Sequence, residues 1–382
     1  MREKARVRVL LLGFSTRALA EAAAAAGYDL ISIDYFADYD QQRLIPAYSL
    51  QRDLGLEYSA ENLRQASQRF SWDAVVYTSN LENHPEVVAK LEEERMVLGN
   101  GPSELRVRNQ RELWEALARA GILFPPSCWC PPGAIRGGER WLVKPEKSGG
   151  GLRIYFWQAG EPVPPRTYWQ CFIPGTPVSA ALVANGVECV VLGITEQFSG
   201  TETAGFLYRG NIVPFLPPEE EDGEALLAEV RRTAARLTCE FGLKGLNGLD
   251  FIYYQGKLYL LEVNPRYTAS MELLTRAYGL DLFQLHVEAC LNESLPQFHL
   301  EQYWHQPSFY GKRVVYARRG VQVPAGIEEV LYRKGVRDIP RGGERIPQGA
   351  PVCTVFATGG SRTECLEHLD LAAEWIYRQL EQ

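Results

Sequence analysis

Residues 260–266 read LLEVNPR, and this stretch decides the fold of the chain. Glu262, Asn264 and Arg266 alternate along it, and they share one face of a strand because side chains in a strand repeat every two residues. The strand is expected to be well buried, since residues 258–261 are Leu, Tyr, Leu and Leu. A carboxylate, an amide and a guanidinium on one face of such a strand are costly to remove from water unless a cation or a partner compensates them.

A second carboxylate is expected on the same face. Residues 245–252 (GLNGLDFI) have the pattern of a strand that carries Asp250, and residues 253–257 (YYQGK) have that of a hairpin turn. Folding this strand antiparallel to the first places Asp250 against Glu262 and Asn264. Three oxygen donors in one patch form the ligand set that Mg²⁺ prefers, with its remaining positions left for water and phosphate oxygens.

A glycine-rich loop follows an earlier strand. Residues 144–154 read KPEKSGGGLRI, directly after the strand-like residues 141–144. Three consecutive glycines let backbone amides fold over phosphate oxygens, and Lys144 places an ammonium at the strand end. A glycine-rich hairpin turn would look the same, and Glu262 would also fit an exposed pair with a surface cation. The loop and the carboxylates together favour a site for a metal ion and a phosphate group.

With these motifs in this order, the chain resembles the ATP-grasp superfamily, which includes biotin carboxylase, carbamoyl-phosphate synthetase, D-alanine-D-alanine ligase and the purine-pathway ligases. The resemblance covers roughly residues 103–300, and the order of several motifs is more specific than any one of them. The segments that carry it are VKPEKSGGG at 143–151, WQCFIPG at 169–175, NGLDFI at 247–252 and LLEVNPR at 260–266.

The resemblance implies a role for each charged residue of these motifs. Asp250, Glu262 and Asn264 are implied to bind two magnesium ions, with Mn²⁺ as an alternative ion. Lys144 is implied to hold the α- and β-phosphates of ATP. Arg266 is implied to face the transferred phosphoryl group, so Lys144 and Arg266 are the two candidate catalytic residues.

The resemblance also implies how the rest of the nucleotide is bound. Four loop residues are implied to close over the phosphates as a lid, and three residues of the next strand to hold the adenine. In chain order they are Ser148, Gly149, Gly150, Gly151, Gln170, Phe172 and Ile173.

One position departs from the family pattern. Many ATP-grasp sequences place a second phosphate-contacting lysine at the start of the helix that corresponds to residues 109–120. Here that position is Gln110. Either Arg108 or Arg111 takes the role, or the nucleotide is held with one cation fewer.

The predicted fold class is α/β and α+β. Strand, helix and strand patterns open the chain, and we expect a Rossmann-like pre-ATP-grasp domain at residues 1–102. Its first turn, GFSTRA at 13–18, lacks the glycines of a dinucleotide-binding fingerprint, which favours a structural wall beside a substrate site. The ATP-grasp domain is expected at 103–300, with a flap subdomain at 143–175. Residues 301–382 resemble the barrel-like C-terminal domain of biotin carboxylase.

Net charge and composition limit the kinds of partner that the protein is expected to bind. The net charge is −7 and the calculated pI is near 5.5, so the chain has no electrostatic footprint for nucleic acid and no basic cluster for a membrane surface. The apolar run near the N-terminus is too short for a spanning helix or a secretory signal. The eight cysteines show no zinc-ribbon spacing, which indicates reduced packing residues. We expect a cytoplasmic protein that forms a homodimer.

ATP-grasp enzymes typically phosphorylate a carboxylate and let a nucleophile capture the acyl phosphate. The leading hypothesis is an ATP-dependent ligase that joins a small-molecule carboxylate to an amine, in the biosynthesis of a one-carbon cofactor. One alternative is an ATP-dependent carboxylase using bicarbonate, although the chain contains no biotinylation-type Met-Lys. Another is a non-catalytic nucleotide sensor, which the intact set of metal ligands disfavours. Substrate contacts are expected at residues 208–211, after a strand at 204–207, and at 267–272.

Overall fold

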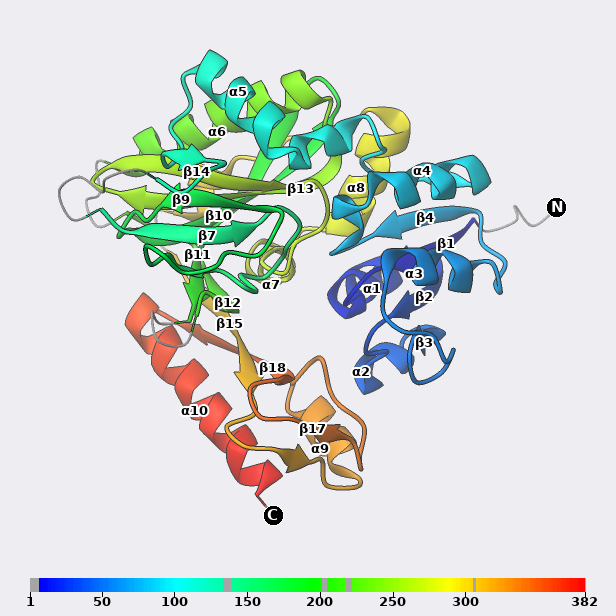
Figure 1. Cartoon of the computed structure of the whole chain (residues 1–382). Helices are drawn as coiled ribbons and strands as arrows, with labels where there is room; N and C mark the ends of the chain where they lie inside the picture. The colour runs from blue at the N-terminus through cyan, green and yellow to red at the C-terminus, as the bar shows by residue number, and fades with distance from the viewer. Residues whose placement is uncertain (1–6, 133–138, 201–204, 218–221, 305–306, 382) are drawn as a thin grey trace.

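The structure is a computed structural model that describes residues 7–132, 139–200, 205–217, 222–304 and 307–381. Figure 1 shows the first hundred residues, in blue, beside a larger body of green and yellow strands and helices, with the C-terminal residues below it in orange and red. The described residues form four sheets. The candidate site lies where the N-terminal region, the small sheet that carries Lys144 and the central sheet meet.

The N-terminal region is a five-stranded parallel sheet with the strand order β3-β2-β1-β4-β5. Its helices cover both faces, because Val9 and Leu11 pack toward α1 whereas Leu10 and Leu12 pack toward α3 and α4. The elements are β1 (Arg8–Leu12), α1 (Arg17–Ala25), β2 (Asp29–Asp34), α2 (Tyr39–Gln42), β3 (Ala47–Ser49), α3 (Ala60–Ser67), β4 (Ala74–Tyr77), η1 (Leu81–Asn83), α4 (Pro85–Glu94), β5 (Met96–Val97) and η2 (Glu104–Arg108).

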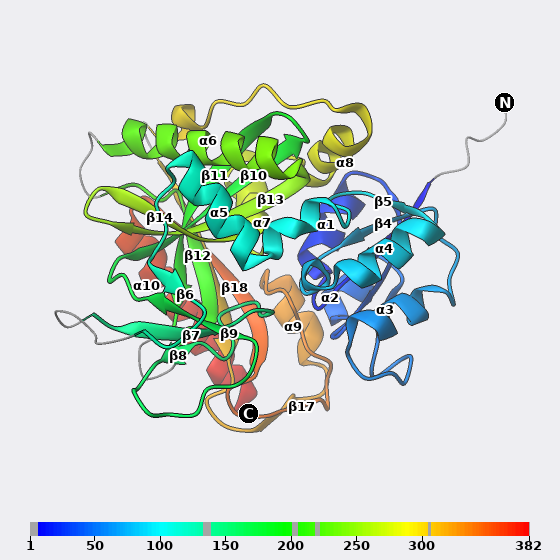
Figure 2. The ribbon, with the colours of Figure 1, turned by 45° about the horizontal axis from the view of Figure 1, so that its top comes forward.

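A small antiparallel sheet follows, with the strand order β6-β9-β7-β8. In Figure 2 it lies at the lower left, and α5 crosses above it. Its strand β7 carries Lys144 and its strand β9 carries Gln170. The elements are α5 (Gln110–Ala120), β6 (Ser127–Cys128), β7 (Trp141–Pro145), β8 (Tyr155–Phe156) and β9 (Thr167–Cys171).

The central sheet has seven strands in the order β14-β13-β10-β11-β12-β15-β18. Helices α5 and α6 cover one face and α7 and α8 the other. The elements are β10 (Thr176–Asn185), β11 (Cys189–Ser199), β12 (Tyr208–Val213), α6 (Asp222–Phe241), β13 (Lys244–Tyr254), β14 (Lys257–Asn264), α7 (Met271–Tyr278), α8 (Leu282–Asn292) and η3 (Leu300–Tyr303).

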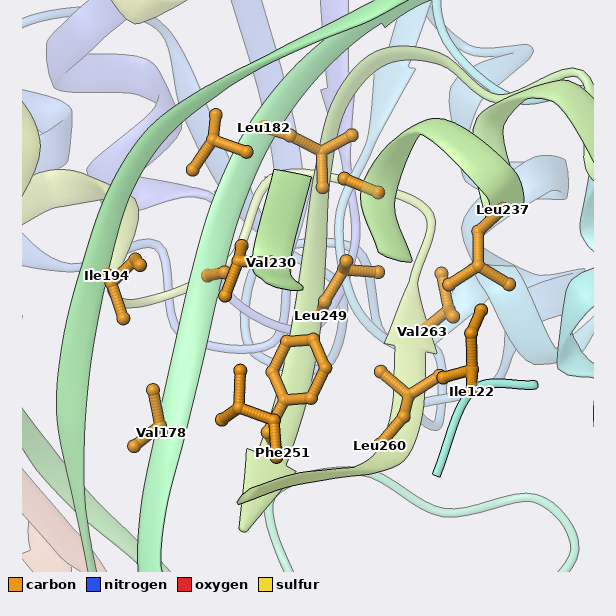
Figure 3. Close-up of a cluster of buried hydrophobic side chains, with 14 of the residues drawn as sticks. Ile122, Val178, Leu182, Ile194, Val230, Leu237, Leu249, Phe251, Leu260 and Val263 are labelled. Atoms are coloured by element: carbon orange, nitrogen blue, oxygen red, sulfur yellow. The ribbon is translucent and has the colours of Figure 1, made fainter. Parts of the chain in front are cut away.

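The core under α6 fixes the direction in which the site residues point. Leu249 and Phe251 of β13 both pack into it, together with side chains of α6 (Figure 3). Because side chains alternate along a strand, Asp250 between them points to the opposite face. The same core takes Leu260 and Val263 of β14, and a register shift after Asp250 lets Glu262 sit opposite it.

The sequence-based expectation of a strand at 204–207 is wrong for the residues that the structure describes. Residues 205–207 are irregular, Ala204 lies outside the described residues, and the strand is β12, which begins at Tyr208. The stretch 208–211, where substrate contacts were expected, therefore lies within strand β12. Tyr208 instead donates its backbone N–H to Gly150 O at 3.0 Å, so this segment packs against the glycine loop.

The C-terminal region does not form a separate barrel among residues 307–381. Its two long strands extend the central sheet, since β15 pairs with β12 on one side and with β18 on the other. Arg337 adds only an isolated bridge to Thr354. The elements are β15 (Phe309–Tyr316), β16 (Val321–Gln322), α9 (Ile327–Arg333), β17 (Arg345–Ile346), β18 (Pro351–Gly359) and α10 (Arg362–Leu380).

All eight cysteines are free thiols, as predicted from their spacing, but Cys130 and Cys239 are exposed, so the prediction of a packing role is wrong for these two. Within the described part of the chain, no helix combines the length and the apolar character that crossing a membrane requires.

Candidate nucleotide and metal site

The hairpin of β13 and β14 brings the three predicted metal ligands together. Asp250 is the register partner of Glu262, and Asn264 pairs with Gly248 two positions away. The Asn264 side chain donates Nδ2 to Asp250 Oδ2 at 2.8 Å. The alternation of polar residues in LLEVNPR therefore correctly predicted that Glu262 and Asn264 share one face of the hairpin.

The two carboxylates affect each other's ionisation. Burial, and then the charge of Glu262, raises the pKa of Asp250 to about 7. Burial also opposes ionisation of Glu262, but the nearby cations Arg108, Lys144 and Arg266 hold its pKa below the usual value. A cation between the two carboxylates would relieve their repulsion, so the electrostatics favour a bound metal ion.

The donor set fits Mg²⁺ better than a transition metal. The described residues contain no group of three His, Cys, Asp or Glu side chains placed to hold a metal ion. The oxygen donors that the hairpin offers are the carboxylates of Asp250 and Glu262 and the amide oxygen of Asn264. Hard oxygen donors with several positions left for phosphate and water are typical of Mg²⁺ in nucleotide sites.

Arg266 reaches across to the N-terminal region. Its Nε donates to Glu82 Oε1 at 2.7 Å, and its guanidinium also donates to Asn264 Oδ1 at 3.1 Å. Glu82 lies in η1, directly after the carboxyl end of β4, and its side chain is only 1% exposed. The sequence analysis missed Glu82; its position after a parallel strand was the one available signal.

Arg108, not Arg111, supplies the extra cation at the site. Its guanidinium donates to Val263 O at 2.8 Å and contacts Glu262 Oε2 at 3.3 Å. It also donates to Ser148 O at 3.3 Å, which fastens the start of the glycine loop to the metal hairpin. Arg111 instead lies over the Trp129 ring, with 5.0 Å to the centroid. That Arg108 replaces a phosphate-contacting lysine is our proposal.

Lys144 and Gln170 are neighbours on the small sheet. Lys144 is buried at the end of β7, and its Nζ donates to Gln170 Oε1 at 3.1 Å. After β9, Phe172 donates its N–H to Arg140 O at 2.7 Å, and Ile173 O accepts from Gly175 N at 2.9 Å. These two backbone groups are already paired, so the adenine contacts expected here would fall to the Phe172 carbonyl and the Ile173 amide.

The glycine loop is fixed at one end and open in the middle. Gly151 has φ +76°, and a Cβ on it would lie 1.8 Å from Phe206 O, so only glycine fits this close approach. A Cβ on Gly149 would meet nothing within 4 Å. The middle of the loop at Gly149 therefore borders open space, whereas Ser148 O is held by Arg108.

The segment 267–272, expected to contact substrate, is mostly buried. Glu272 accepts from both Arg17 and Lys312, with 2.7 Å from Lys312 Nζ, so it forms a buried ion cluster between regions. Arg209 is exposed on β12 and lies 5.9 Å from the centroid of the Tyr316 ring. These residues therefore connect elements of the fold.

Lys144→Ala is expected to weaken nucleotide binding about tenfold or more, because it removes a charged hydrogen-bond donor from a buried site. The exposed Lys147→Ala on the same segment is the matched control. Calorimetric titration of the two variants with Mg-ATP would measure the difference. Unchanged affinity of the Lys144 variant would assign that lysine a structural role.

The family comparison agrees with this geometry. Residues 107–270 match the model of a family described as the ATP-grasp domain. The chain contains an ATP-grasp domain. Both β7 with its lysine and the β13–β14 hairpin lie inside the matched residues.

The curated relatives share this ATP-grasp domain over a short stretch. The arginine-specific large chain of carbamoyl phosphate synthase from Geobacillus stearothermophilus is 28% identical over 124 residues, which are 32% of this chain and 11% of that protein. The matched segment thus spans about a tenth of such relatives.

Solved structures share the fold over almost the whole chain. One is the biotin carboxylase domain of Hydrogenobacter thermophilus 2-oxoglutarate carboxylase, in complex with MgADP, ADP and bicarbonate. It has a TM-score of 0.68 at 15% identity and covers 93% of this chain and 86% of that chain. Another is an L-amino acid ligase from Bacillus licheniformis, with a TM-score of 0.66 at 18% identity over 96% of each chain. The regions on both sides of the ATP-grasp domain therefore belong to a shared three-dimensional arrangement.

Proposed function

We propose that this chain is an ATP-dependent ligase that activates a small-molecule carboxylate as an acyl phosphate and joins it to an amine. The observation that carries the proposal is the set of Asp250, Glu262 and Asn264 on one hairpin, facing Arg108 and Arg266. The L-amino acid ligase of similar fold supports amide formation as the reaction class.

The proposed roles follow from charge. Asp250, Glu262 and Asn264 would hold two Mg²⁺ ions, with Mn²⁺ as an alternative, and the ions would neutralise phosphate charge. Lys144 and Arg108 would bind the phosphates of ATP under residues 148–151. Phosphoryl transfer needs positioning and charge neutralisation more than covalent chemistry by the protein.

The reaction would proceed in two steps. A substrate carboxylate oxygen attacks the γ-phosphorus, which gives an acyl phosphate and ADP, with Arg266 beside the transferred group. The amine nitrogen then attacks the acyl carbon; the carbon–nitrogen bond forms, the carbon–oxygen bond to phosphate breaks, and the nitrogen loses a proton. Closure of the glycine loop would keep water from the acyl phosphate.

A carboxylase using bicarbonate is the second candidate. The structure of similar fold that holds MgADP and bicarbonate favours it. A nucleotide sensor without catalysis is a weaker third candidate, because the chain carries Asp250, Glu262, Asn264 and Arg266, the residues that the proposed catalysis requires. The one-carbon-cofactor setting and the homodimer also stay proposals; the carboxylase domain of similar fold is described as a dimer.

The test of the proposed function is ADP release with Mg-ATP and a panel of carboxylates, with hydroxylamine added to trap an acyl phosphate as a hydroxamate. Hydroxamate formation with an organic acid would support the ligase. Turnover with bicarbonate and no organic acid would favour the carboxylase instead. Nucleotide binding with no ADP release from any member of the panel would count against both.

A further inference from the structure

An aromatic cluster lies at the carboxyl end of the N-terminal parallel sheet. It consists of Phe14 after β1, Tyr35 and Phe36 after β2, and Tyr58 before α3. The Phe14 ring stacks on Tyr35 at 5.3 Å between centroids and meets Phe36 and Tyr58 edge-on at 5.2 and 5.1 Å. Ligands of parallel sheets bind at this end of the strands.

Packing in the hydrophobic core does not account for the position of these rings. Phe14 and Tyr35 are 38% and 37% exposed, and neither belongs to any of the buried clusters of the described residues. Their backbones are nevertheless fixed, because Tyr35 N donates to Phe14 O at 3.1 Å and Phe14 N donates to Ser79 O. A rigid, partly exposed pair of stacked rings offers a surface on which another ring can stack.

A buried carboxylate oxygen without a partner lies beside the cluster. Glu82 gives Oε1 to Arg266, but its buried Oε2 accepts no hydrogen bond from any described residue. Glu82 lies three residues after Ser79, whose backbone carbonyl accepts a hydrogen bond from the Phe14 N–H. Its charge also reaches Tyr58, where it adds to burial in raising the pKa of that phenol. An unpaired buried carboxylate oxygen is costly unless a ligand donates to it.

We propose, on the basis of the ligase function above, that the amine substrate carries an aromatic ring. It binds as the ammonium, which donates to Glu82 Oε2 while its ring stacks on Phe14 and Tyr35; the nitrogen gives one proton to water before it attacks the acyl carbon and a second one afterwards. The acid substrate does not fit this position, because its carboxylate would be repelled by Glu82. An ammonium near aromatic faces gains a further electrostatic attraction. Glu82 thereby links the amine to Arg266, which stands beside Asn264 of the metal hairpin.

The first experiment measures binding of phenethylamine to the full chain with Mg²⁺ and a non-hydrolysable ATP analogue, by ligand-observed NMR titration. The comparison probes are n-propylamine, which lacks the ring, 2-phenylethanol, which lacks the ammonium, and 3-phenylpropanoate, which carries the opposite charge. Phenethylamine is expected to bind about tenfold or more tightly than each. Equal binding of n-propylamine, preference for the acid, or no binding of phenethylamine would overturn the proposal.

Matched variants locate the binding site. Tyr35→Leu removes one ring of the stacked pair, and Tyr303→Leu removes an equally exposed ring, at 37%, from η3. Glu82→Gln removes the buried charge, and Glu86→Gln removes an exposed one paired with His84. Tyr35→Leu and Glu82→Gln are each expected to weaken phenethylamine binding about tenfold, and the two controls to leave it unchanged. Equal effects of a variant and its control would contradict the assignment.

Failure of this inference is distinguishable from failure of the proposed function. Hydroxylamine carries no ring and takes the place of the amine, so hydroxamate formation by the unmodified chain reports on carboxylate activation alone. Hydroxamate without selectivity for phenethylamine would leave the ligase standing and remove the aromatic amine. Selective phenethylamine binding without any hydroxamate would support the aromatic amine site and count against the ligase function.

Discussion

Glu262→Gln is expected to keep the fold and to lose ATP-dependent turnover by about a hundredfold to a thousandfold. The substitution preserves the shape of the side chain but removes one of the two carboxylates on the metal hairpin. The lost charge also faced Arg108, so the site becomes more positive and holds a divalent cation less well. Turnover is measured as ADP release, and the fold by circular dichroism and thermal melting.

Glu229→Gln serves as the control for this variant. Glu229 pairs with Arg232 on the surface of α6, away from the hairpin, and exposed pairs contribute little. A Glu262 variant with near-normal ADP release would remove Glu262 from the metal site. Raising the Mg²⁺ concentration should restore part of the activity, because weaker binding is the expected defect.

Asp250→Asn is expected to stabilise the metal-free protein at pH 8 and to abolish its stabilisation by Mg-ATP. Burial and the charge of Glu262 raise the pKa of Asp250 to about 7 in the folded chain. The folded state is therefore destabilised by ionisation of Asp250, progressively as pH rises from about 4 to about 7. Asparagine cannot ionise, so the variant gains on the order of 2 kcal/mol at pH 8, with solvent screening of the half-buried group included.

The sign of this effect can be tested by changing the pH. At pH 5 Asp250 already carries its proton in the folded protein, so most of the stability difference between the two proteins should disappear. Urea unfolding at pH 5 and pH 8, with and without Mg-ATP, measures both parts of the prediction. Asp370→Asn, which removes an exposed carboxylate paired with Arg313, is the control. A variant less stable than the parent at pH 8 would contradict the raised pKa.

The residues of the metal hairpin were predictable because their signal is local. Strand alternation in LLEVNPR and GLNGLDFI sets the face of each side chain, and the Gln255-Gly256 turn sets the register next to it. The register shift after Asp250, which brings Glu262 opposite it, is not encoded in the turn. The glycine loop is local in the same sense. Its contact with Phe206 was not, because that contact joins segments more than fifty residues apart.

Other parts of the site depend on long-range packing. Arg108 and Arg111 looked equivalent in the sequence, and only the packing of η2 against β14 selected Arg108. Glu82 meets Arg266 across 184 residues of chain. The C-terminal strands have the expected β pattern. Such a pattern does not determine which strands pair, and β15 pairs with β12 of the central sheet.

The sequence by itself determined the ATP-grasp motifs, the direction of the metal ligands and the strand and helix periods that build each layer. Those features depend on neighbours a few residues away, where backbone geometry dictates which side chains share a face. The tertiary structure alone decided that Glu82 meets Arg266 and that Phe14 stacks on Tyr35. Such a meeting depends on how separate layers bury their apolar faces against one another, which no local pattern encodes.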